Sequence, residues 1–479
     1  MKGRAVLVAL LLAGCTTVGP NHSVPDAAVP SQYAEPHDAQ GLSDAELASW
    51  WRQFGDPQLD SLIARAIALN LDVQSAAARI REARARELVA GARNLPTLDA
   101  QASATRQRIS ENAIPTPPGA GAPGSGGAFG LPGSEFNTFR LGLDASWEID
   151  LFGGTRRGIE SAGARTGAAT WTRRDLQATA AAEVANAYFT LRTLQERMAN
   201  AKADLDRQNR EEQLRQARFK GGLINGIDVE QQKSDAAIAA AELPALRAQA
   251  DAQIHAIGLL TGTTPEALIA ELSSAKTIPT SPAIPAGLPS DLLRRRPDIR
   301  AAEREVAAAT ADIGVATADL YPRISLTAAP ALVSTALTSL LDWGSRSYSL
   351  GASLLWPLFD GGKARANIEV ANARQEQALI AYRKSVLTAL KDVEDALSRT
   401  QADRDRLTDL ARSHEAATRA EALSRTRFRG GLVTYSEVLT NQGKRLSVEK
   451  QMIETRGALA RDSVALFKAL GGGWPEQQP

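Results

Sequence analysis

The sequence carries an internal duplication with a period of roughly 210 residues, far longer than the repeats of solenoid proteins. The seven-residue segment that starts at Arg218 and contains Gly221-Gly222 recurs at Arg427 with Gly430-Gly431. Three further pairs keep the same order along the chain: Pro96 and Pro322, Trp147 and Trp356, and Gly153-Gly154 and Gly361-Gly362. The chain is therefore predicted to form two halves that share one order of elements.

Each half contains a long stretch without proline, at residues 155–219 and 363–467. A helix of about 65 residues would be about 100 Å long, whereas helices of globular proteins average about 11–12 residues. Apolar residues from Val386 to Leu397 are spaced by 4, 3 and 4 positions, which is typical of coiled coils. We expect a long helix and an antiparallel partner in each half, joined by a glycine turn. A rod-like periplasmic coiled coil would show the same pattern.

A helix is predicted at the start of each half, at residues 57–92 and 290–319, and two strands follow it. In the second strand of each pair, every other residue is apolar, from Phe139 to Trp147 and from Tyr348 to Trp356. Runs of about ten alternating residues with aromatic ends are typical of transmembrane strands. A soluble β-sandwich with one solvated face is the alternative.

The loops between the paired strands are predicted at residues 113–133, which are rich in proline and glycine, and at residues 330–346. Four strands cannot close a barrel that has a lumen, because even small filled barrels need about eight. Unpaired strand edges are not tolerated in lipid. Three chains would supply twelve strands, so the pattern favours a trimer.

The N-terminus has the features of an export signal. Lys2 and Arg4 precede a short apolar run, which ends at Leu12-Ala13-Gly14-Cys15. This end resembles a bacterial lipobox, in which Cys15 would become the first mature residue and carry acyl chains, although an ordinary signal peptide with an incidental cysteine is the alternative. Thr16 stands where an aspartate would favour retention in the inner membrane, so the outer membrane is expected.

The composition argues against other classes of protein. The net charge is +1, with 55 basic and 54 acidic residues, which gives no reason to expect nucleic acid. One cysteine and four scattered histidines predict no metal site. No nucleophile elbow, P-loop or HExxH motif is present, so we expect no enzyme and no cofactor apart from a covalent lipid on Cys15.

Five segments together resemble the TolC-like outer-membrane efflux proteins, specifically their lipoprotein branch. They are SWWRQFGDPQLDSLIARAIALN (49–70), LPSDLLRRRPDIRAAERE (288–305), LYPRISL (320–326), WPLFDGGKARANI (356–368) and ALGGGW (469–474). The resemblance implies a mainly α-helical fold with duplicated halves, in which a homotrimer closes a 12-stranded β-barrel in the outer membrane. A long α-helical barrel of twelve helices would continue into the periplasm.

The same resemblance divides the chain into six segments. They are a signal peptide (1–14), a lipidated N-terminal equatorial segment (15–56), a first repeat (57–262), an equatorial linker (263–288), a second repeat (289–473) and a C-terminal tail (474–479). The implied function is passive conduction of substrates to the exterior. The implied partners are outer-membrane lipid, a periplasmic adaptor and an inner-membrane pump of the resistance–nodulation–division type. A non-conducting periplasmic coiled-coil scaffold is the alternative from another class.

Matched by position, Asp228 and Glu437 take the places of gate acids at the periplasmic mouth, and Thr440 stands where relatives often carry a further aspartate. Arg218 and Arg427 could pair with these acids. Acids that stabilise helix N-termini would occupy the same positions. The proposed adaptor-docking tips are the two turns, Gly221-Gly222-Leu223-Ile224 and Gly430-Gly431-Leu432-Val433, where glycine would also simply permit a tight turn.

The basic run Arg294-Arg295-Arg296 precedes Pro297. We interpret it as a solvated helix start with acidic neighbours rather than as a functional cluster.

We expect Cys15→Ser to abolish acylation, because only the thiol of this cysteine can carry the lipid. Labelling with a radioactive fatty acid measures the result. A serine variant that is still labelled would contradict the lipobox.

Overall fold

The computed structural model describes residues 17–35, 40–108, 110 and 135–474. The chain divides into two compact units. The first, here called the strand unit, comprises Met1–Ser23, Ala83–Thr166 and Val306–Ala378, and the second, the helix unit, comprises Val24–Glu82, Gly167–Glu305 and Leu379–Pro479. In the described part of the chain, no helix is both long enough and apolar enough to cross a membrane.

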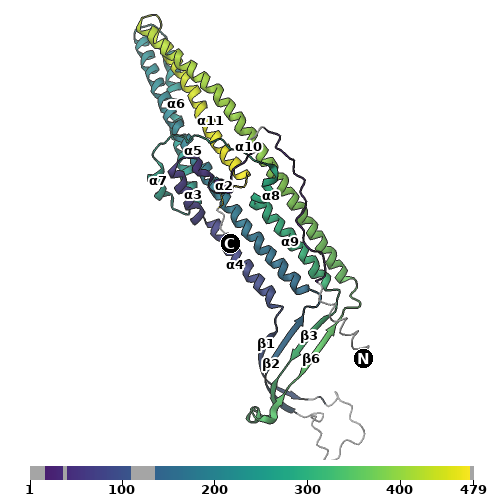
Figure 1. Ribbon diagram of the computed structural model, residues 1–479. Coiled ribbons are helices and arrows are strands. Elements are labelled where there is room, and N and C mark those ends of the chain that lie inside the picture. The colour runs from purple at the N-terminus through teal and green to yellow at the C-terminus, as the bar shows by residue number, and fades with distance from the viewer. Residues whose placement is uncertain (1–16, 36–39, 109, 111–134, 475–479) are drawn as a thin grey trace, which may run out of the picture. The chain divides into compact units, whose positions relative to one another are not determined.

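The strand unit contains one antiparallel sheet (Figure 1). Its strands are β1 (Thr97–Arg108), β2 (Glu135–Ile149), β3 (Arg323–Ala328), β4 (Ala331–Ser334), β5 (Arg346–Ser347) and β6 (Leu350–Leu355). β1 pairs with one side of β2, and β3 and β4 both pair with its other side. β6 then pairs with β3, and β5 with β4.

β3 and β4 behave as one strand that is interrupted at Pro330. Both keep the same register against β2, with Ala145 opposite Ala328 and Leu141 opposite Leu332. Proline lacks an N–H group, but the carbonyl of Pro330 still accepts a hydrogen bond of 2.9 Å from the Leu143 amide. The predicted loop at residues 330–346 is therefore too long.

The actual connection is shorter and contains two short helical turns, η3 (Leu337–Ser339) and η4 (Trp343–Ser345). β5 and β6 are likewise continuous, because Ser349 between them exchanges two backbone hydrogen bonds with Ala329. The sheet thus consists of four long strands, two from each half, as the alternation predicts.

The register places every predicted apolar position on one face of the sheet. Leu98, Ala145, Ala328 and Leu350 lie across from one another in successive strands. The intervening residues, among them Asp99, Asp144, Thr327 and Gly351, form the opposite face. Many of the apolar side chains are exposed in the single chain, including Leu98 and Leu350 at 67% and 76%.

The long helices also agree with the prediction. α5 (Gly154–Lys220) and α10 (Lys363–Arg429) have 67 residues each, and α6 (Gly226–Leu260) and α11 (Tyr435–Ala469) have 35 each. α6 contains Pro244, so a proline-free sequence did not predict this helix. Alanine-rich faces and i, i+4 ion pairs such as Lys391–Asp395 accompany these helices.

The first helix of each half is broken, contrary to the prediction. The first half has α3 (Pro57–Leu69) and α4 (Leu71–Ala92), and the second has η2 (Pro289–Asp291), α8 (Leu292–Arg295) and α9 (Pro297–Ala318). Arg296 is extended because it precedes Pro297. Asn70 separates the two helices and caps α4, because its side-chain oxygen accepts hydrogen bonds from the backbone amides of Asp72 and Val73.

The two break residues occupy equivalent positions and make equivalent contacts. Asn70 donates its side-chain amide to the carbonyl of Leu260, the last residue of α6, at 3.0 Å. Arg296 donates its guanidinium to the carbonyl of Ala469, the last residue of α11, at 3.2 Å. Each therefore satisfies a terminal carbonyl that has no partner within its own helix.

An aromatic cluster forms part of the core of the helix unit. Trp50 in η1 (Trp50–Phe54) stacks on Phe467 with a centroid distance of 5.2 Å, and Phe54 packs on Phe189 at 4.8 Å. All four rings are buried. The short helices α2 (Asp44–Ala48) and α7 (Pro265–Leu272) contribute buried leucines. The segments that contain α2 and η1 before Pro57, and α7 after Gly262, thus belong to this packed unit.

Glu242 connects three of the long helices. Its carboxylate on α6 accepts from Lys450 on α11 at 2.9 Å and from Arg197 on α5 at 3.1 Å. The hydrogen bond from Lys450, followed by the charges of Lys450 and Arg197, holds the pKa of Glu242 below its ordinary value. A carboxyl group with a lowered folded pKa stabilises the fold above its unfolded pKa and loses that effect as the pH falls.

We expect Glu242→Gln to lower the free energy of unfolding by about 0.5–1 kcal/mol at pH 7, because the side chain is partly exposed and its ion pairs are screened. The difference should shrink as the pH falls below about 4.3, through the lowered folded pKa. Thermal unfolding across this pH range measures it. Glu230→Gln is the control, since Glu230 pairs only with its exposed neighbour Lys233. A pH-independent difference for Glu242→Gln would contradict the assignment.

Candidate functional site

The two turns between the long helices have the same backbone geometry. In the first, the amide of Gly222 bonds to the carbonyl of Phe219 and the amide of Leu223 to that of Arg218, both at 2.9 Å. In the second, Gly431 and Leu432 make the equivalent two bonds at the same distances. These are Schellman motifs, whose central residue is left-handed, and Gly222 and Gly431 have φ of 70° and 71°.

Large apolar side chains are exposed at both turns. Leu223 and Leu432, at equivalent positions, are 72% and 70% exposed. Ile224 and Val433 are half-buried, whereas the four glycines are exposed. The turns are thus rigid in their backbone and apolar at their surface, which suits a protein contact better than a flexible connection.

The predicted gate acids lie in the first turns of α6 and α11. The amide of Asp228 is capped by the side chain of Asn225 at 3.1 Å, and the carboxylate of Asp228 is half-buried. Glu437 and Thr440 are exposed, and the Thr440 hydroxyl donates to the carbonyl of Ser436. Acids in a first turn also interact favourably with the helix dipole, so the placement agrees with both interpretations of these residues.

The expected pairing of the acids with Arg218 and Arg427 is not formed within the described residues, where neither arginine makes an ion pair. Arg215, one turn before Arg218, reaches the start of α6 without pairing with either gate carboxylate. Its guanidinium contacts the carboxylate of Glu211 at 3.1 Å and the backbone carbonyl of Asp228 at 3.3 Å. Ser436 donates to the same Glu211 oxygen at 3.0 Å. Glu211 therefore joins α5 to the starts of α6 and α11.

A second buried acid lies on α10. Glu421 is 6% exposed and binds Arg425 on its own helix and Arg445 on α11, the latter at 2.7 Å. Neither Glu211 nor Glu421 is predicted from the sequence. Glu211 and Glu212 are adjacent, and only the heptad phase of α5 could have indicated which of them is buried. In the described chain, no group of three or more potential ligands is placed to bind a metal.

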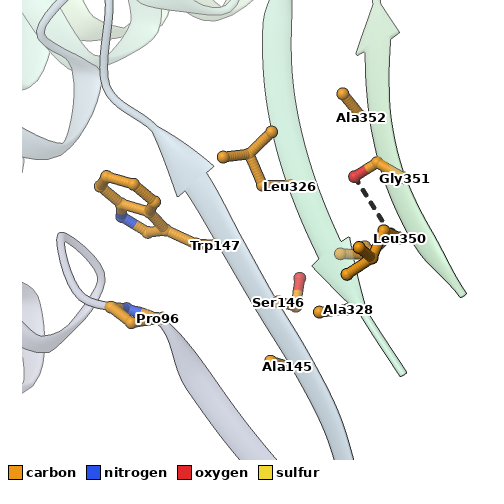
Figure 2. Close-up of a pocket in the computed structure, with 10 residues that line it drawn as sticks. Pro96, Ala145, Ser146, Trp147, Leu326, Ala328, Leu350, Gly351 and Ala352 are labelled. Atoms are coloured by element: carbon orange, nitrogen blue, oxygen red, sulfur yellow. Dashed lines mark hydrogen bonds between the residues drawn. The ribbon is translucent and has the colours of Figure 1, made fainter. Parts of the chain in front are cut away.

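A shallow hollow of about 450 Å³ lies on the sheet of the strand unit. Figure 2 shows Trp147 of β2 beside Pro96, with Leu326 and Leu350 from the neighbouring strands. The indole N–H of Trp147 donates to the carbonyl of Asn94 at 3.1 Å. In the second half, Trp356 makes the equivalent bond to Leu320, also at 3.1 Å. Each tryptophan thus links the end of a strand to the second residue after a helix, α4 in the first half and α9 in the second.

The described chain begins with a segment that is held firmly in the strand unit. The amide of Val18 bonds to the carbonyl of Phe152 at 3.1 Å. Arg157, which is 3% exposed, donates to the carbonyls of Val18 and Gly19 and to the side chain of Asn21. Cys15, the predicted lipidation site, lies outside the described residues.

The basic run 294–296 is not uniformly solvated, so our interpretation is wrong for one of its members. Arg294 is exposed and pairs with Asp291. Arg296 is 8% exposed and binds Asp298 at 2.7 Å and Asp392 of α10 at 3.2 Å. Arg296 is buried at the point where the helix breaks before Pro297, and Asp392 is too distant in sequence to be anticipated.

Comparison with known proteins decides the family. The sequence profile described as "Outer membrane efflux protein" matches residues 62–263 and 288–472. The chain belongs to this outer-membrane efflux protein family. The family consists of transport proteins, and its match to most of the chain confirms the resemblance that the sequence motifs indicate.

Individual relatives cover nearly the whole length. The chain is 35% identical to the pyoverdine export outer membrane protein OpmQ of Pseudomonas aeruginosa, over 99% of this chain and 97% of that one. It is 32% identical to nodulation protein T of Rhizobium leguminosarum bv. viciae, over 98% and 93%. The solved structure of the outer-membrane channel OprN superimposes with a TM-score of 0.84 at 35% identity, covering 96% of this chain and 99% of that chain. The fold is therefore that of TolC-like outer-membrane channels.

We expect Glu211→Ala to loosen the turns of this efflux protein, because Arg215 and Ser436 would lose their shared acceptor. The expected loss of stability is about 1–3 kcal/mol, with faster amide exchange in the two turns. Hydrogen–deuterium exchange with urea unfolding measures both. Glu212→Ala is the matched control, since among the described residues the carboxylate of Glu212 accepts a hydrogen bond from Gln216 on its own helix and none from α11. Equal exchange in the two variants would contradict the role of Glu211.

Proposed function

We propose that this protein is the trimeric outer-membrane duct of a tripartite efflux system, through which substrates pass passively to the exterior. The observation that carries the proposal is the sheet: four strands with one apolar face and an edge strand on each side. β1 and β6 each have one neighbouring strand among the described residues. Three copies that pair edge to edge would make a closed barrel of twelve strands and leave no edge in lipid.

The long helices are the evidence for the periplasmic part of the proposed duct. A trimer would combine twelve of them into a helical barrel, whose polar and charged faces suit a water-filled lumen. The two turns of each chain would form the periplasmic mouth. There, a periplasmic adaptor would dock and connect the duct to an inner-membrane pump of the resistance–nodulation–division type.

The acids at the turns favour the interpretation that the periplasmic mouth is gated. The carboxylates of Asp228 and Glu437 make no ion pair within the described chain, so they are available for contacts across a trimer. Three-fold symmetry would convert each into a ring of three negative charges, which attracts cations. Because residue 440 is a threonine rather than an aspartate, the second half would not form a further acidic ring.

Lipid contacts would hold the duct in place. The apolar sheet face, including the hollow beside Trp147, would contact outer-membrane lipid. Acyl chains on Cys15 would add an anchor, and the Arg157 contacts that hold Val18 and Gly19 would keep that anchor close to the strand unit.

We assign the selection of the cargo to the pump rather than to the duct. Relatives of similar identity are named for pyoverdine export, nodulation and toluene efflux. Proteins of one architecture that serve such different cargoes indicate a lumen with little selectivity of its own.

The test is the assembly and conductance of the purified protein. We expect a heat-modifiable trimer in outer-membrane fractions and single channels in planar bilayers. A chain that stays in the periplasm and forms no pore would instead be a non-conducting scaffold, and the proposal would fall.

For the gate, Asp228→Ala combined with Glu437→Ala should raise the conductance of the assembled trimer, because two rings of charge that hold cations and polar contacts at the mouth are removed. Asp251→Ala, an exposed acid of α6 far from the turn, is the control and should leave conductance unchanged. Unchanged conductance in the correctly assembled double variant would count against a gating role for these acids.

A further inference from the structure

Arg346 is a charged residue on the apolar face of the sheet. In the register, it pairs with Leu332 of β4, which pairs in turn with Leu141 of β2. Residues directly opposite each other in antiparallel strands share a face, so Arg346 lies on the same face as Leu141. The alternation continues from Arg346 through Tyr348 to Leu350. A cation on a face that contacts lipid is unfavourable, and the penalty falls toward the membrane–water interface. The presence of Arg346 here therefore calls for a partner.

The position of Arg346 along the strand corresponds to the outer edge of a membrane-spanning band. Trp356, which bonds to the carbonyl of Leu320, follows Arg346 by ten positions along β5 and β6. Ten residues of a strand cover about 33 Å. In a strand tilted by about 40° they rise about 25 Å, which is the height of the apolar band of a membrane barrel. The chain continues from Trp356 into α10, which the proposed function assigns to the periplasm. With Trp356 at the inner interface, Arg346 is at the outer leaflet.

A second shallow hollow, separate from the one beside Trp147, lies next to Arg346 and has a volume of about 450 Å³. Leu141 and Leu143 are 44% and 43% exposed, and Tyr348 is 80% exposed. The lining residues that belong to the apolar face by register and alternation are Ala100, Leu141, Leu143, Leu332, Arg346 and Tyr348. The hollow is thus an apolar depression with a cation at its rim.

The guanidinium of Arg346 is held in place but has no counter-ion in the described part of the chain. Its Nε–H donates to the carbonyl of Trp343 at 2.7 Å, and its plane of nitrogens lies over the indole ring of Trp343. Its two terminal nitrogens form no hydrogen bond or ion pair with another described residue. By contrast, Arg106, further along the same face, pairs with Glu135 at 2.6 Å. A guanidinium whose terminal donors are free matches the geometry of a phosphate group.

We propose that Arg346 and this hollow bind a phosphorylated glycolipid of the outer leaflet, of the lipid A type. A phosphate group pairs with Arg346, and an acyl chain lies in the hollow. The proposal rests on the proposed function, which sets the orientation of the sheet in the membrane. Pairing of β6 with a neighbouring copy would use the backbone groups of the strand edge and leave this face open. A trimer would therefore have three such sites.

The test titrates purified lipid A into the trimer in an uncharged detergent and counts the bound lipids by native mass spectrometry. We expect saturation at three lipids per trimer. Arg346→Gln should weaken binding by about 10-fold, because a charge-assisted pair is lost. Arg346→Lys should retain part of the affinity, since it keeps the charge without the planar pair of donors. Arg140→Gln is the matched control, because Arg140 precedes Leu141 in β2, lies on the opposite face and pairs with Asp144. It should leave binding unchanged.

Two further comparisons separate the apolar and charged parts of the site. Ala100→Trp should fill the hollow with an indole ring and weaken the binding of lipid A without a change in charge. Enzymatically dephosphorylated lipid A should bind the unmodified protein about 10-fold more weakly than lipid A. Phosphatidylglycerol should also bind more weakly, and inorganic phosphate alone should not displace lipid A.

The outcomes distinguish the possible failures. If the unmodified protein forms neither a trimer nor a channel, the proposed function and this inference fall together. If it conducts as a trimer but Arg346→Gln binds lipid A as tightly as Arg140→Gln does, the inference alone is wrong. Equal binding of lipid A and either its dephosphorylated form or phosphatidylglycerol would also overturn it. If Arg346→Gln does not assemble, Ala100→Trp decides, and unweakened binding by that variant would reject the site.

Discussion

The constraint on which the structure depends is a sheet that the single chain cannot complete. A strand edge exposes N–H and C=O groups that require partners, and the requirement is strictest where lipid replaces water. Here β1 and β6 form the edges, and the face that contains Leu98 and Leu350 is apolar. The helices do not remove this need, because in the strand unit those apolar side chains remain exposed. The sheet therefore favours association with other copies, and this requirement is the basis on which we propose a closed trimer.

Duplication has preserved positions while changing the side chains that occupy them. Asn70 and Arg296 both break a helix and both bind the last carbonyl of a helical hairpin, one with a neutral amide and the other with a charged guanidinium. The charged version is buried and therefore requires counter-ions, which Asp298 and Asp392 provide. The second half thus uses a network of charges where the first uses the hydrogen bonds of one neutral amide.

The sequence predicted the features that repeat locally. Alternation predicts the strands and their faces, and the absence of proline predicts α5, α10 and α11, because both patterns depend on neighbours in the chain. The breaks at Asn70 and before Pro297 were missed, although Asn before Leu-Asp and any residue before proline are local signals of a helix boundary. The strand at Ala331–Ser334 lies within the loop predicted at residues 330–346, because proline lacks an amide for the ladder, whereas the carbonyl of Pro330 continues the pairing.

Contacts between distant segments could not be predicted in the same way. Nothing near Glu211 in the sequence indicates Ser436, and nothing near Arg296 indicates Asp392, since each pair meets only when separate helices pack. The same limit applied to Arg218 and Arg427, which were adjacent to the turns in sequence but pair with neither gate acid in the described chain.

The turns show how one backbone can support two different surfaces. The Schellman geometry depends on Gly222 and Gly431 and is the same in both halves, so it fixes where the helices end without selecting a partner. Recognition must then come from the side chains around it. Glycine at position 226 leaves Phe219 50% exposed, whereas Tyr435 at the equivalent position packs on Phe428, which is 41% exposed. The two turns can therefore present different side chains without any difference in backbone between the two halves.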